Sequence, residues 1–189
     1  PIMTVRGPAV QAQLIETIAL LIINHESLIA TKSSRIKRAA KGRAVMEFGA
    51  RRAQGIDASV YGAKASYIAG IDGTSNVLTG KLFNIPVLGT MAHSWVQMFD
   101  TELEAFKAFA KSFPNNCVLL VDTYNTLQSG IPNAIKTFDE ILKPMGIRPK
   151  GIRLDSGDLA YLSKQARKML DNAGYEDAQI VVSNSLDEY

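Results

Sequence analysis

Short apolar runs that alternate with stretches of helical periodicity constrain the fold of this chain more than any other feature. The runs are nearly continuous in apolar character and do not alternate with polar residues. They cover residues 44–48, 67–71, 86–88, 118–121, 151–154 and 179–182, and the helical patterns between them cover 57–66, 75–82, 101–111, 130–142 and 158–172. A strand that is apolar on both sides must be covered on both faces, so the pattern predicts an α/β protein with a parallel sheet. Residues 9–32 predict a long amphipathic helix ahead of it.

Polar residues follow all six predicted strands and bear on whether the sheet is open or closed. Each run is followed by a cluster of Gly, Asp, Ser, Thr, Arg or His. The carboxyl ends of all strands meet at one mouth in a (β/α) barrel, whereas only those beside the switch point share a site in a doubly wound sheet. The clusters therefore favour an irregular parallel (β/α) barrel over the open sheet.

The length of the chain indicates that this barrel is incomplete. A (β/α)₈ barrel takes about 250 residues, and this chain has 189 residues with six predicted strands. We expect an N-terminal helical segment over residues 1–43 and a partial barrel over residues 44–189, cut from a larger protein.

Composition excludes several classes of protein. The chain is 47% hydrophobic and 21% charged, which is typical of globular proteins and unlike disordered or fibrous ones. The single cysteine, Cys117, cannot form an internal disulfide, and we expect it to be a small buried residue of a cytoplasmic protein. The longest uninterrupted apolar stretch, residues 17–23, is shorter than the roughly 20 residues of a membrane span, so no membrane association is expected. The basic residues in 32–43 predict a solvated helix face, and with few aromatics near them we expect no nucleic-acid partner.

His93 is a candidate catalytic residue, although a structural role stays open. It lies in Gly-Thr-Met-Ala-His-Ser-Trp, residues 89–95, after a predicted strand. Serine and threonine hydroxyls there could orient an imidazole. His25 lies in the middle of a predicted helix, where a surface or packing role is expected.

Residues 151–159 carry the densest set of polar groups. Arg153 lies within an apolar strand, so its guanidinium must meet an anion or point to water in the barrel mouth. Asp155 and Asp158 flank a Ser-Gly turn that leads into a helix, where backbone N–H groups suit an anion and carboxylates suit sugar hydroxyls or Mg²⁺. We expect Asp158 to be the helix N-cap and Arg153 and Asp155 to be functional.

Two further strand ends offer groups that could bind a ligand. Phe48 could stack on a planar ring, and Arg51 or Arg52 could bind a carboxylate or phosphate, although both cannot face one site if the segment is extended. Asp122 could be a site carboxylate or a helix cap. The sequence has no metal-ligand spacing, Walker loop or Rossmann glycine pattern. The chemistry indicated is anion and sugar binding assisted by a histidine.

Taken together and in order, these segments resemble the nicotinate phosphoribosyltransferases, which are type II phosphoribosyltransferases built on an irregular α/β barrel. The resemblance runs through nearly the whole chain, from Arg6-Gly7-Pro8 and the helix that follows. It is carried by EFGARRAQG (47–55), GIDGTSNVLTGKL (70–82), GTMAHSW (89–95), VDTYNT (121–126), GIRLDSGDLAYLSKQARKML (151–170) and VVSNSLDEY (181–189).

The resemblance implies an enzyme of NAD biosynthesis. Its members join nicotinic acid to 5-phosphoribosyl 1-pyrophosphate, giving nicotinate mononucleotide and pyrophosphate, with ATP as co-substrate and Mg²⁺ accompanying the pyrophosphate and ATP. It implies that His93 is the histidine phosphorylated by ATP and that Asp155 holds the ribose hydroxyls. It implies that Thr90 and Arg153 contact nicotinate. A cytoplasmic homodimer is also implied. A further alternative is that this chain alone is an inactive piece of the enzyme.

Within this resemblance, five further residues receive roles. Phe48 would stack near the nicotinate ring and Arg51 would belong to the same anion-rich pocket. Ser75 stands where nicotinamide-using relatives have an aspartate; because a carboxylate would repel nicotinate, a serine favours the acid over the amide. Ser183 and Asn184 occupy the phosphate-binding turn, without the glycine expected there, but Asn tolerates a left-handed backbone. The alternatives are a nicotinamide or quinolinate phosphoribosyltransferase, or a non-catalytic phosphate-binding α/β domain.

Overall fold

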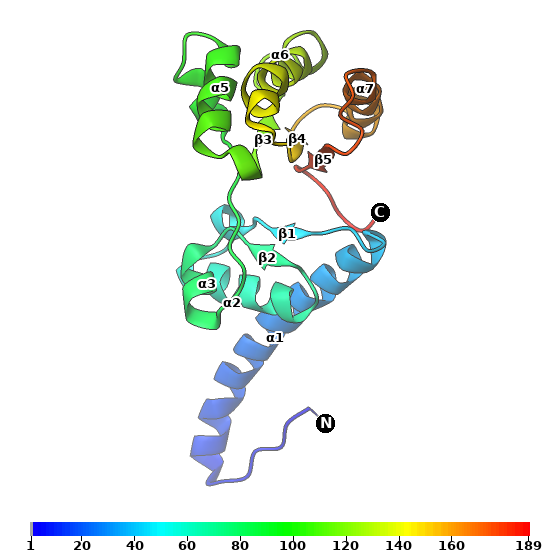
Figure 1. Cartoon of the computed structure of the whole chain (residues 1–189). Coiled ribbons are helices and arrows are strands. Elements are labelled where there is room, and N and C mark those ends of the chain that lie inside the picture. The colour runs from blue at the N-terminus through cyan, green and yellow to red at the C-terminus, as the bar shows by residue number, and fades with distance from the viewer. Residues whose placement is uncertain (1) are drawn as a thin grey trace. The chain divides into compact units, whose positions relative to one another are not determined.

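The chain forms two compact units, each with its own parallel strands and helices (Figure 1). The structure is a computed structural model that describes residues 2–189. Unit 1 comprises the chain up to Gly89 together with Asp187–Tyr189, and unit 2 comprises Thr90–Leu186. The boundary predicted at residue 43 stays a prediction.

Unit 1 is built around the long helix α1 (Ala9–Ala39), which packs against α2 (Ile56–Ile68). Ser33 donates a buried hydrogen bond of 2.9 Å to Ser66 across this contact, and Nε2 of His25 lies 3.2 Å from the Ala58 carbonyl. His25 therefore has the packing role expected of it. Two short strands, β1 (Met46–Glu47) and β2 (Gly73–Thr74), pair in parallel, and Val87 adds one further parallel bridge to Thr74. A 3₁₀ helix (η1, Ala50–Arg52) and the helix α3 (Val77–Phe83) complete the unit.

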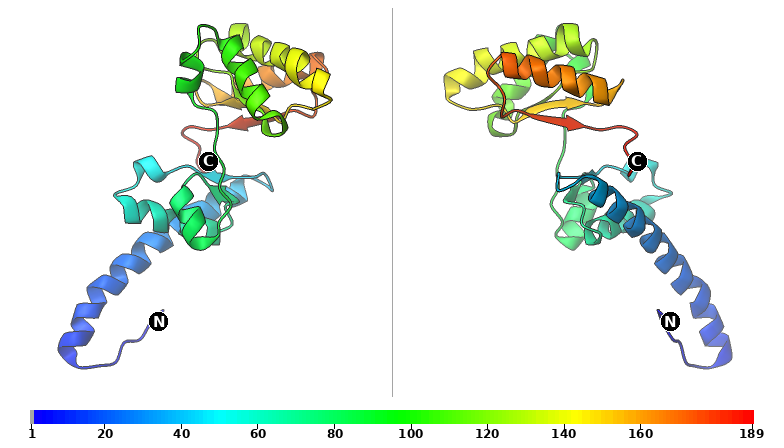
Figure 2. Two further views of the ribbon diagram at one scale, coloured as in Figure 1. Left: turned by 60° about the vertical axis from the view of Figure 1, so that its left-hand side comes forward. Right: turned by 90° about the vertical axis from the view of Figure 1, so that its right-hand side faces the viewer.

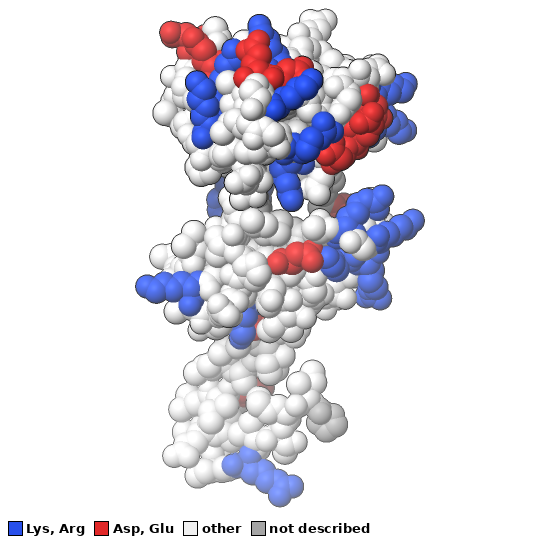
Figure 3. Space-filling model, viewed as in Figure 1, with Lys and Arg blue, Asp and Glu red and all other residues white. Residues whose placement is uncertain are grey.

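Helix α1 is charged near its C-terminal end and apolar over most of its length. Figure 3 shows a blue patch near this end of the helix. Lys37 pairs with Asp72 at 2.5 Å, and Arg35 pairs with Glu188 at 3.2 Å. The earlier part exposes many apolar side chains: Val10, Leu14, Ile15, Ile18, Leu20, Leu21, Ile22 and Leu28.

By length and composition alone, α1 could cross a membrane. The longest uninterrupted apolar stretch, residues 17–23, does not reveal this property, because polar residues interrupt the apolar character of the helix. A core helix of a soluble protein and a signal sequence have the same composition, so this property by itself does not distinguish among them.

Unit 2 contains a three-stranded parallel sheet with helices along one face (Figures 1 and 2). The strands β3 (Val118–Leu120), β4 (Gly151–Leu154) and β5 (Gln179–Val182) lie in that order, and Leu119 pairs with Ile152, which pairs with Ile180. The covering helices are α5 (Glu102–Ser112), α6 (Ile131–Thr137) with π-helical turns before and after it (η3, Thr126–Gly130; η4, Phe138–Leu142), and α7 (Leu159–Asn172). Short helices α4 (His93–Gln97), η2 (Pro114–Asn116) and η5 (Lys143–Met145) complete the unit.

Local sequence accounts for the limits of these helices. Thr101 and Glu104 form a capping box at the start of α5, and Asp158 caps α7 by accepting from the Tyr161 N–H at 2.9 Å. The core of unit 2 is made by fully buried apolar side chains, of which the largest are Phe106, Phe138, Leu119, Leu120, Ile131, Leu142, Ile152, Leu154 and Leu170.

The structure confirms the α/β class and the parallel pairing, and it corrects two strands. The predicted strand at residues 67–71 is wrong, because α2 continues to Ile68. Gly70, two residues after its end, has a φ of +101°, the left-handed conformation typical of the residue that follows a helix. The predicted strand at 86–88 is only the isolated bridge at Val87. Neither sheet closes on itself within residues 2–189, so the barrel and its six strands remain a prediction.

Candidate functional site

Polar side chains meet at the carboxyl ends of the three strands of unit 2. Asp122, Asp155 and Ser183 each follow one of β3, β4 and β5. Because the strands are parallel and adjacent, their carboxyl ends lie at one edge of the sheet and bring these residues together.

Asp122 is the most buried of these groups, with 1% of its side chain exposed. Its Oδ1 lies 3.1 Å from Nε2 of His93. Its Oδ2 accepts hydrogen bonds from the backbone N–H of Asp155, at 2.9 Å, and from the hydroxyl of Ser156. Asn125, rather than Asp122, caps the helical segment that follows β3. Of the two roles left open for Asp122, the structure favours the site carboxylate.

Arg153 projects from β4 and is almost fully buried. Its guanidinium donates to the Met91 carbonyl at 3.0 Å and to Ser183 Oγ at 3.1 Å, and it lies 3.4 Å from Asp155 Oδ1. Ser183 in turn donates to Asp155. The anion that the sequence required for Arg153 is therefore the carboxylate of Asp155. Its Nε is buried without a hydrogen-bond partner among the described residues.

His93 is the first residue of α4, and 38% of its side chain is exposed. Nε2 faces Asp122, and Nδ1 lies 3.9 Å from Asp155 Oδ2. The imidazole thus lies between two carboxylates and remains partly accessible to a ligand. Asp158 lies outside this cluster and has the capping role expected of it.

The candidate residues of unit 1 are held by a glutamate that the sequence analysis did not select. The carboxylate of Glu47 accepts from the Gly49 N–H and, at 2.6 Å, from the hydroxyl of the buried Thr74. The Glu47 carbonyl accepts from the Ser75 N–H at 3.0 Å. The hydrogen bonds of Glu47 therefore connect the segment that carries Phe48 with the segment that carries Ser75. An acidic residue at the end of a short strand, directly before Phe-Gly, was the available sequence signal.

The remaining predicted residues are exposed or lie in turns. Phe48 is 36% exposed. Arg51 and Arg52 lie in the 3₁₀ helix η1 and are both exposed, so the premise that this segment is extended is wrong. Thr90 is exposed at the start of unit 2.

The turn after β5 has the backbone anticipated for Asn184. Asn184 has a φ of +82° and Ser185 a φ of +51°, so two consecutive non-glycine residues are left-handed. The turn therefore forms without a glycine.

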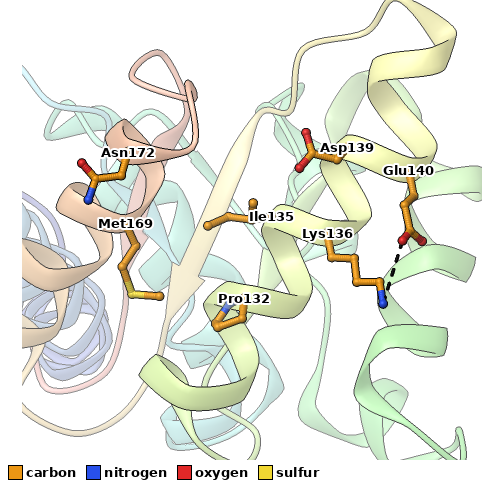
Figure 4. A pocket seen from close by; sticks show the side chains of 7 residues that line it. All are labelled: Pro132, Ile135, Lys136, Asp139, Glu140, Met169 and Asn172. Carbon is orange, nitrogen blue, oxygen red and sulfur yellow. Dashed lines mark ion pairs between the residues drawn. The ribbon is translucent and has the colours of Figure 1, made fainter.

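A groove elsewhere on unit 2 is separate from these residues. It has a volume of about 550 Å³ and lies between α6 with η4 and α7 (Figure 4). It is lined by Pro132, Ile135, Lys136, Asp139, Glu140, Met169 and Asn172, and none of the candidate residues is among them. Within residues 2–189, no group of three or more His, Cys, Asp or Glu side chains is placed to hold a metal ion.

Comparison with known proteins identifies the relatives of the chain. A family model described as the nicotinate phosphoribosyltransferase (NAPRTase) family matches residues 43–188. Over its whole length the chain is 54% identical to a nicotinate phosphoribosyltransferase of Bacillus subtilis (strain 168) and 48% identical to nicotinate phosphoribosyltransferase pncB2 of Mycobacterium tuberculosis (strain ATCC 25618 / H37Rv). It spans 38% and 40% of the length of these relatives.

Solved structures agree with this relationship. The crystal structure of human nicotinic acid phosphoribosyltransferase matches 96% of the chain with a TM-score of 0.87 and 33% identity, and the chain covers 47% of it. A nicotinate-nucleotide pyrophosphorylase from Pyrococcus furiosus matches 87% of the chain with a TM-score of 0.73 and 29% identity, and the chain covers 42% of it. Because the family model matches residues 43–188 and these relatives match nearly the whole chain, the chain belongs to the nicotinate phosphoribosyltransferase family.

Proposed function

We propose that this chain carries part of the active site of a nicotinate phosphoribosyltransferase. The enzyme joins nicotinic acid to 5-phosphoribosyl 1-pyrophosphate, giving nicotinate mononucleotide and pyrophosphate for NAD biosynthesis, with coupled ATP hydrolysis. The observation that carries the proposal is the cluster of His93, Asp122, Asp155, Arg153 and Ser183 at one sheet edge, in a chain that belongs to this family.

The chemistry of phosphoribosyl transfer matches these residue types. As pyrophosphate leaves, the anomeric carbon gains positive charge, and a fixed carboxylate such as Asp155 stabilises that charge and binds ribose hydroxyls. The carboxylate is fixed because Arg153 and Ser183 both contact its Oδ1. His93, partly exposed, is the group that accepts a phosphoryl from ATP. The added dianion changes the charge around the strand ends and can reorganise the neighbouring turns.

Nicotinate binding is assigned by the family resemblance to Phe48, Arg51, Ser75, Thr90 and Arg153. An arginine fork matches the planar carboxylate of nicotinate, and an aromatic ring matches its pyridine.

Phosphate and metal binding complete the proposed site. Ser183 and Asn184, at a turn with left-handed backbone, are assigned to phosphate. Mg²⁺ is commonly held by one or two carboxylates together with substrate phosphates, so it does not need a cluster of three protein ligands, and Asp155 is the carboxylate that suits it. When bound, Mg²⁺ neutralises the developing charge on the leaving pyrophosphate.

The same resemblance supports the finer features of the enzyme. The strands belong to an irregular parallel (β/α) barrel that other parts of the protein complete, with residues 1–43 as an N-terminal helical segment and 44–189 in the catalytic domain. The enzyme acts in the cytoplasm as a homodimer.

The test is an assay of the complete gene product with nicotinate, nicotinamide and quinolinate in parallel, each with 5-phosphoribosyl 1-pyrophosphate and with or without ATP. We expect turnover of nicotinate, stimulated by ATP, and labelling of a phosphohistidine that is lost in His93→Gln. Preference for nicotinamide or quinolinate favours an alternative phosphoribosyltransferase, and no turnover of any of the three favours a non-catalytic phosphate-binding domain. If His93→Gln keeps both labelling and ATP stimulation, the role of His93 is wrong.

Ser75 provides a separate test of substrate choice. Ser75→Asp places a carboxylate where nicotinate is proposed to bind, so it should reduce kcat/KM for nicotinate more than for nicotinamide. Ser75→Ala is the matched control, because it removes the hydroxyl without adding charge. An unchanged preference in Ser75→Asp contradicts the assignment.

A further inference from the structure

The carboxylate of Glu47, a residue to which the family resemblance gave no role, folds back onto the backbone two residues further along the chain. Its Oε1 accepts a hydrogen bond from the Gly49 N–H, so Phe48 is the central residue of a short loop. A side-chain oxygen that bonds the backbone two residues on holds the chain in a turn. The carboxylate can approach so closely because residue 49 is a glycine: an added Cβ would lie 2.8 Å from Glu47 Oε1. Glu47 and Gly49 thus hold Phe48 between them.

A second loop of the same form lies at the end of the neighbouring strand. The Thr74 hydroxyl accepts from the Asn76 N–H at 2.9 Å, so Ser75 is the central residue of this loop. Thr74 is fully buried, so no water replaces this hydrogen bond. Asn76 is also the N-cap of α3, because its side chain accepts from the Thr79 N–H at 3.1 Å. The loop around Ser75 is therefore anchored at both ends.

Glu47 joins the two loops. It lies opposite Thr74 in the parallel pairing of β1 with β2, and its Oε2 accepts from the Thr74 hydroxyl at 2.6 Å. An ionised carboxylate accepts hydrogen bonds at both of its oxygens. One oxygen of Glu47 therefore serves the loop around Phe48, and the other serves the loop around Ser75.

We propose that Glu47 is a positioning residue for nicotinate, which holds the ring of Phe48 and the side chain of Ser75 in a fixed relation to each other. This inference rests on the proposed function, in which Phe48 stacks on the pyridine and Ser75 distinguishes the acid from the amide. Protein donors occupy both oxygens of Glu47, so its effect on the substrate is exerted through the two loops.

The two loops serve different parts of recognition, and this makes their contributions separable. A stacked aromatic ring contacts the pyridine of nicotinate and of nicotinamide alike, so loss of the loop around Phe48 weakens the binding of both ligands by the same factor. Ser75 is assigned to the substituent at which the two ligands differ. Loss of the loop around Ser75 therefore changes the ratio of the two affinities.

Two substitutions at Glu47 test the residue itself. Glu47→Ala removes both hydrogen bonds of the carboxylate. Glu47→Gln is the conservative variant, because its amide oxygen can still accept from the Gly49 N–H while its NH₂ faces the Thr74 hydroxyl. It should therefore restore part of the affinity that Glu47→Ala loses. Glu176→Ala is the matched control, since it removes the side chain of an exposed glutamate.

Two further substitutions leave Glu47 in place and disturb one loop each. In Gly49→Ala the added Cβ displaces only the mobile end of the Glu47 side chain, and the φ of −83° at Gly49 is ordinary for alanine. Thr74→Val removes the buried hydroxyl and keeps a branched side chain of similar size.

The experiment measures the binding of nicotinate and of nicotinamide to the complete gene product by calorimetry. 5-Phosphoribosyl 1-pyrophosphate is left out, so that no turnover occurs. A separate kinetic assay gives the KM for 5-phosphoribosyl 1-pyrophosphate, which a general loss of structure would also raise. An aromatic stack contributes up to about tenfold in affinity, so we expect the Kd of nicotinate to rise about tenfold in Glu47→Ala, with that KM within about twofold of wild type. Glu47→Gln should lie between the two, and Glu176→Ala should bind as wild type does.

We expect Gly49→Ala to raise the Kd of both ligands by the same factor and Thr74→Val to change their ratio by at least about threefold. The inference is overturned by wild-type nicotinate binding in Glu47→Ala or Gly49→Ala, by an unchanged ratio in Thr74→Val, or by an equal rise in the Kd of nicotinate and the KM of the other substrate. If Glu47→Ala does not fold, Gly49→Ala and Thr74→Val still decide. A wild type that binds nicotinate without turning it over counts against the proposed function, and the binding series then still decides the role of Glu47. A wild type that does not bind nicotinate overturns both.

Discussion

At Gly130, helix propensity and tertiary packing predict opposite effects of an alanine substitution on the stability of the protein. The residue ends the π-helical turn η3 and has a right-handed helical φ of −59°. Alanine is favoured over glycine within helices by about 1 kcal/mol, so propensity alone predicts that Gly130→Ala stabilises the protein. The structure predicts the reverse.

The magnitude follows from the space around the Gly130 α-carbon. An added Cβ would lie 1.8 Å from the carbonyl oxygen of Val121 and 2.6 Å from its carbon, where ordinary contact begins at 3.4 Å. Both atoms belong to the backbone, and Val121 is held in place because its N–H donates to the Arg153 carbonyl at 3.2 Å. The turn η3 must therefore move away from the end of β3. Overpacking of a core costs about 1–3 kcal/mol and occasionally more, and since no flexible side chain can yield here, we expect a net loss of at least about 2 kcal/mol.

The assay is urea unfolding of the full chain followed by far-UV circular dichroism. Gly146→Ala is the control, because Gly146 has a φ of +70° and no heavy atom within 4 Å of its added Cβ. That variant should lose only the roughly 1–2 kcal/mol of a left-handed alanine. The reasoning is refuted if Gly130→Ala is as stable as wild type, or if it loses no more free energy of unfolding than Gly146→Ala.

Two further predictions concern titratable groups in the core of unit 2. Burial raises the pKa of the Cys117 thiol to about 12, and Cys117 is the only cysteine of the chain. The native protein should therefore not react with a thiol reagent such as Ellman's reagent, whereas the protein in urea should react fully. Rapid reaction of the native protein would contradict the burial of Cys117. Burial, together with its hydrogen bond to Asp139, raises the pKa of Tyr175 to about 12. Since the unfolded value is about 10, the stability that this phenol contributes is complete below pH 10 and is lost as the pH rises towards 12. The free energy of unfolding of wild type relative to Tyr175→Phe should therefore fall as the pH rises from about 10 towards 12. A constant difference would contradict the shift.

Much of the local structure could be predicted from the sequence. The helix α7 begins after the cap Asp158 and ends before Gly174, whose φ is +80°, as its pattern indicates. The strands β3, β4 and β5 fall within the predicted apolar runs. The apolar run at 67–71 led to a wrong strand prediction, because Tyr67 and Ile68 extend a helix. Four or five apolar residues alone do not distinguish a helix end from a buried strand.

The residues of the candidate site could be predicted from the sequence more fully than the contacts between them. Polar groups at strand ends pointed to His93, Arg153 and Asp155, which the structure places within one network. Glu47 was missed, and Asp122 was left between two roles, because the importance of each depends on partners 27 to 34 positions away in the sequence.

The sequence by itself determined the α/β class, the Asp158 cap, the three apolar runs that form the strands of unit 2 and the resemblance to the family, because these depend on periodicity, capping chemistry and ordered local motifs. Only the tertiary structure decided that Arg153 pairs with Asp155 and that Asp122 faces Nε2 of His93. It also decided that an alanine cannot replace Gly130 without moving a backbone segment. The physical reason is the same in each case: parallel pairing of β3, β4 and β5 brings the ends of distant segments to one edge, and that proximity leaves no trace in the local pattern of residues.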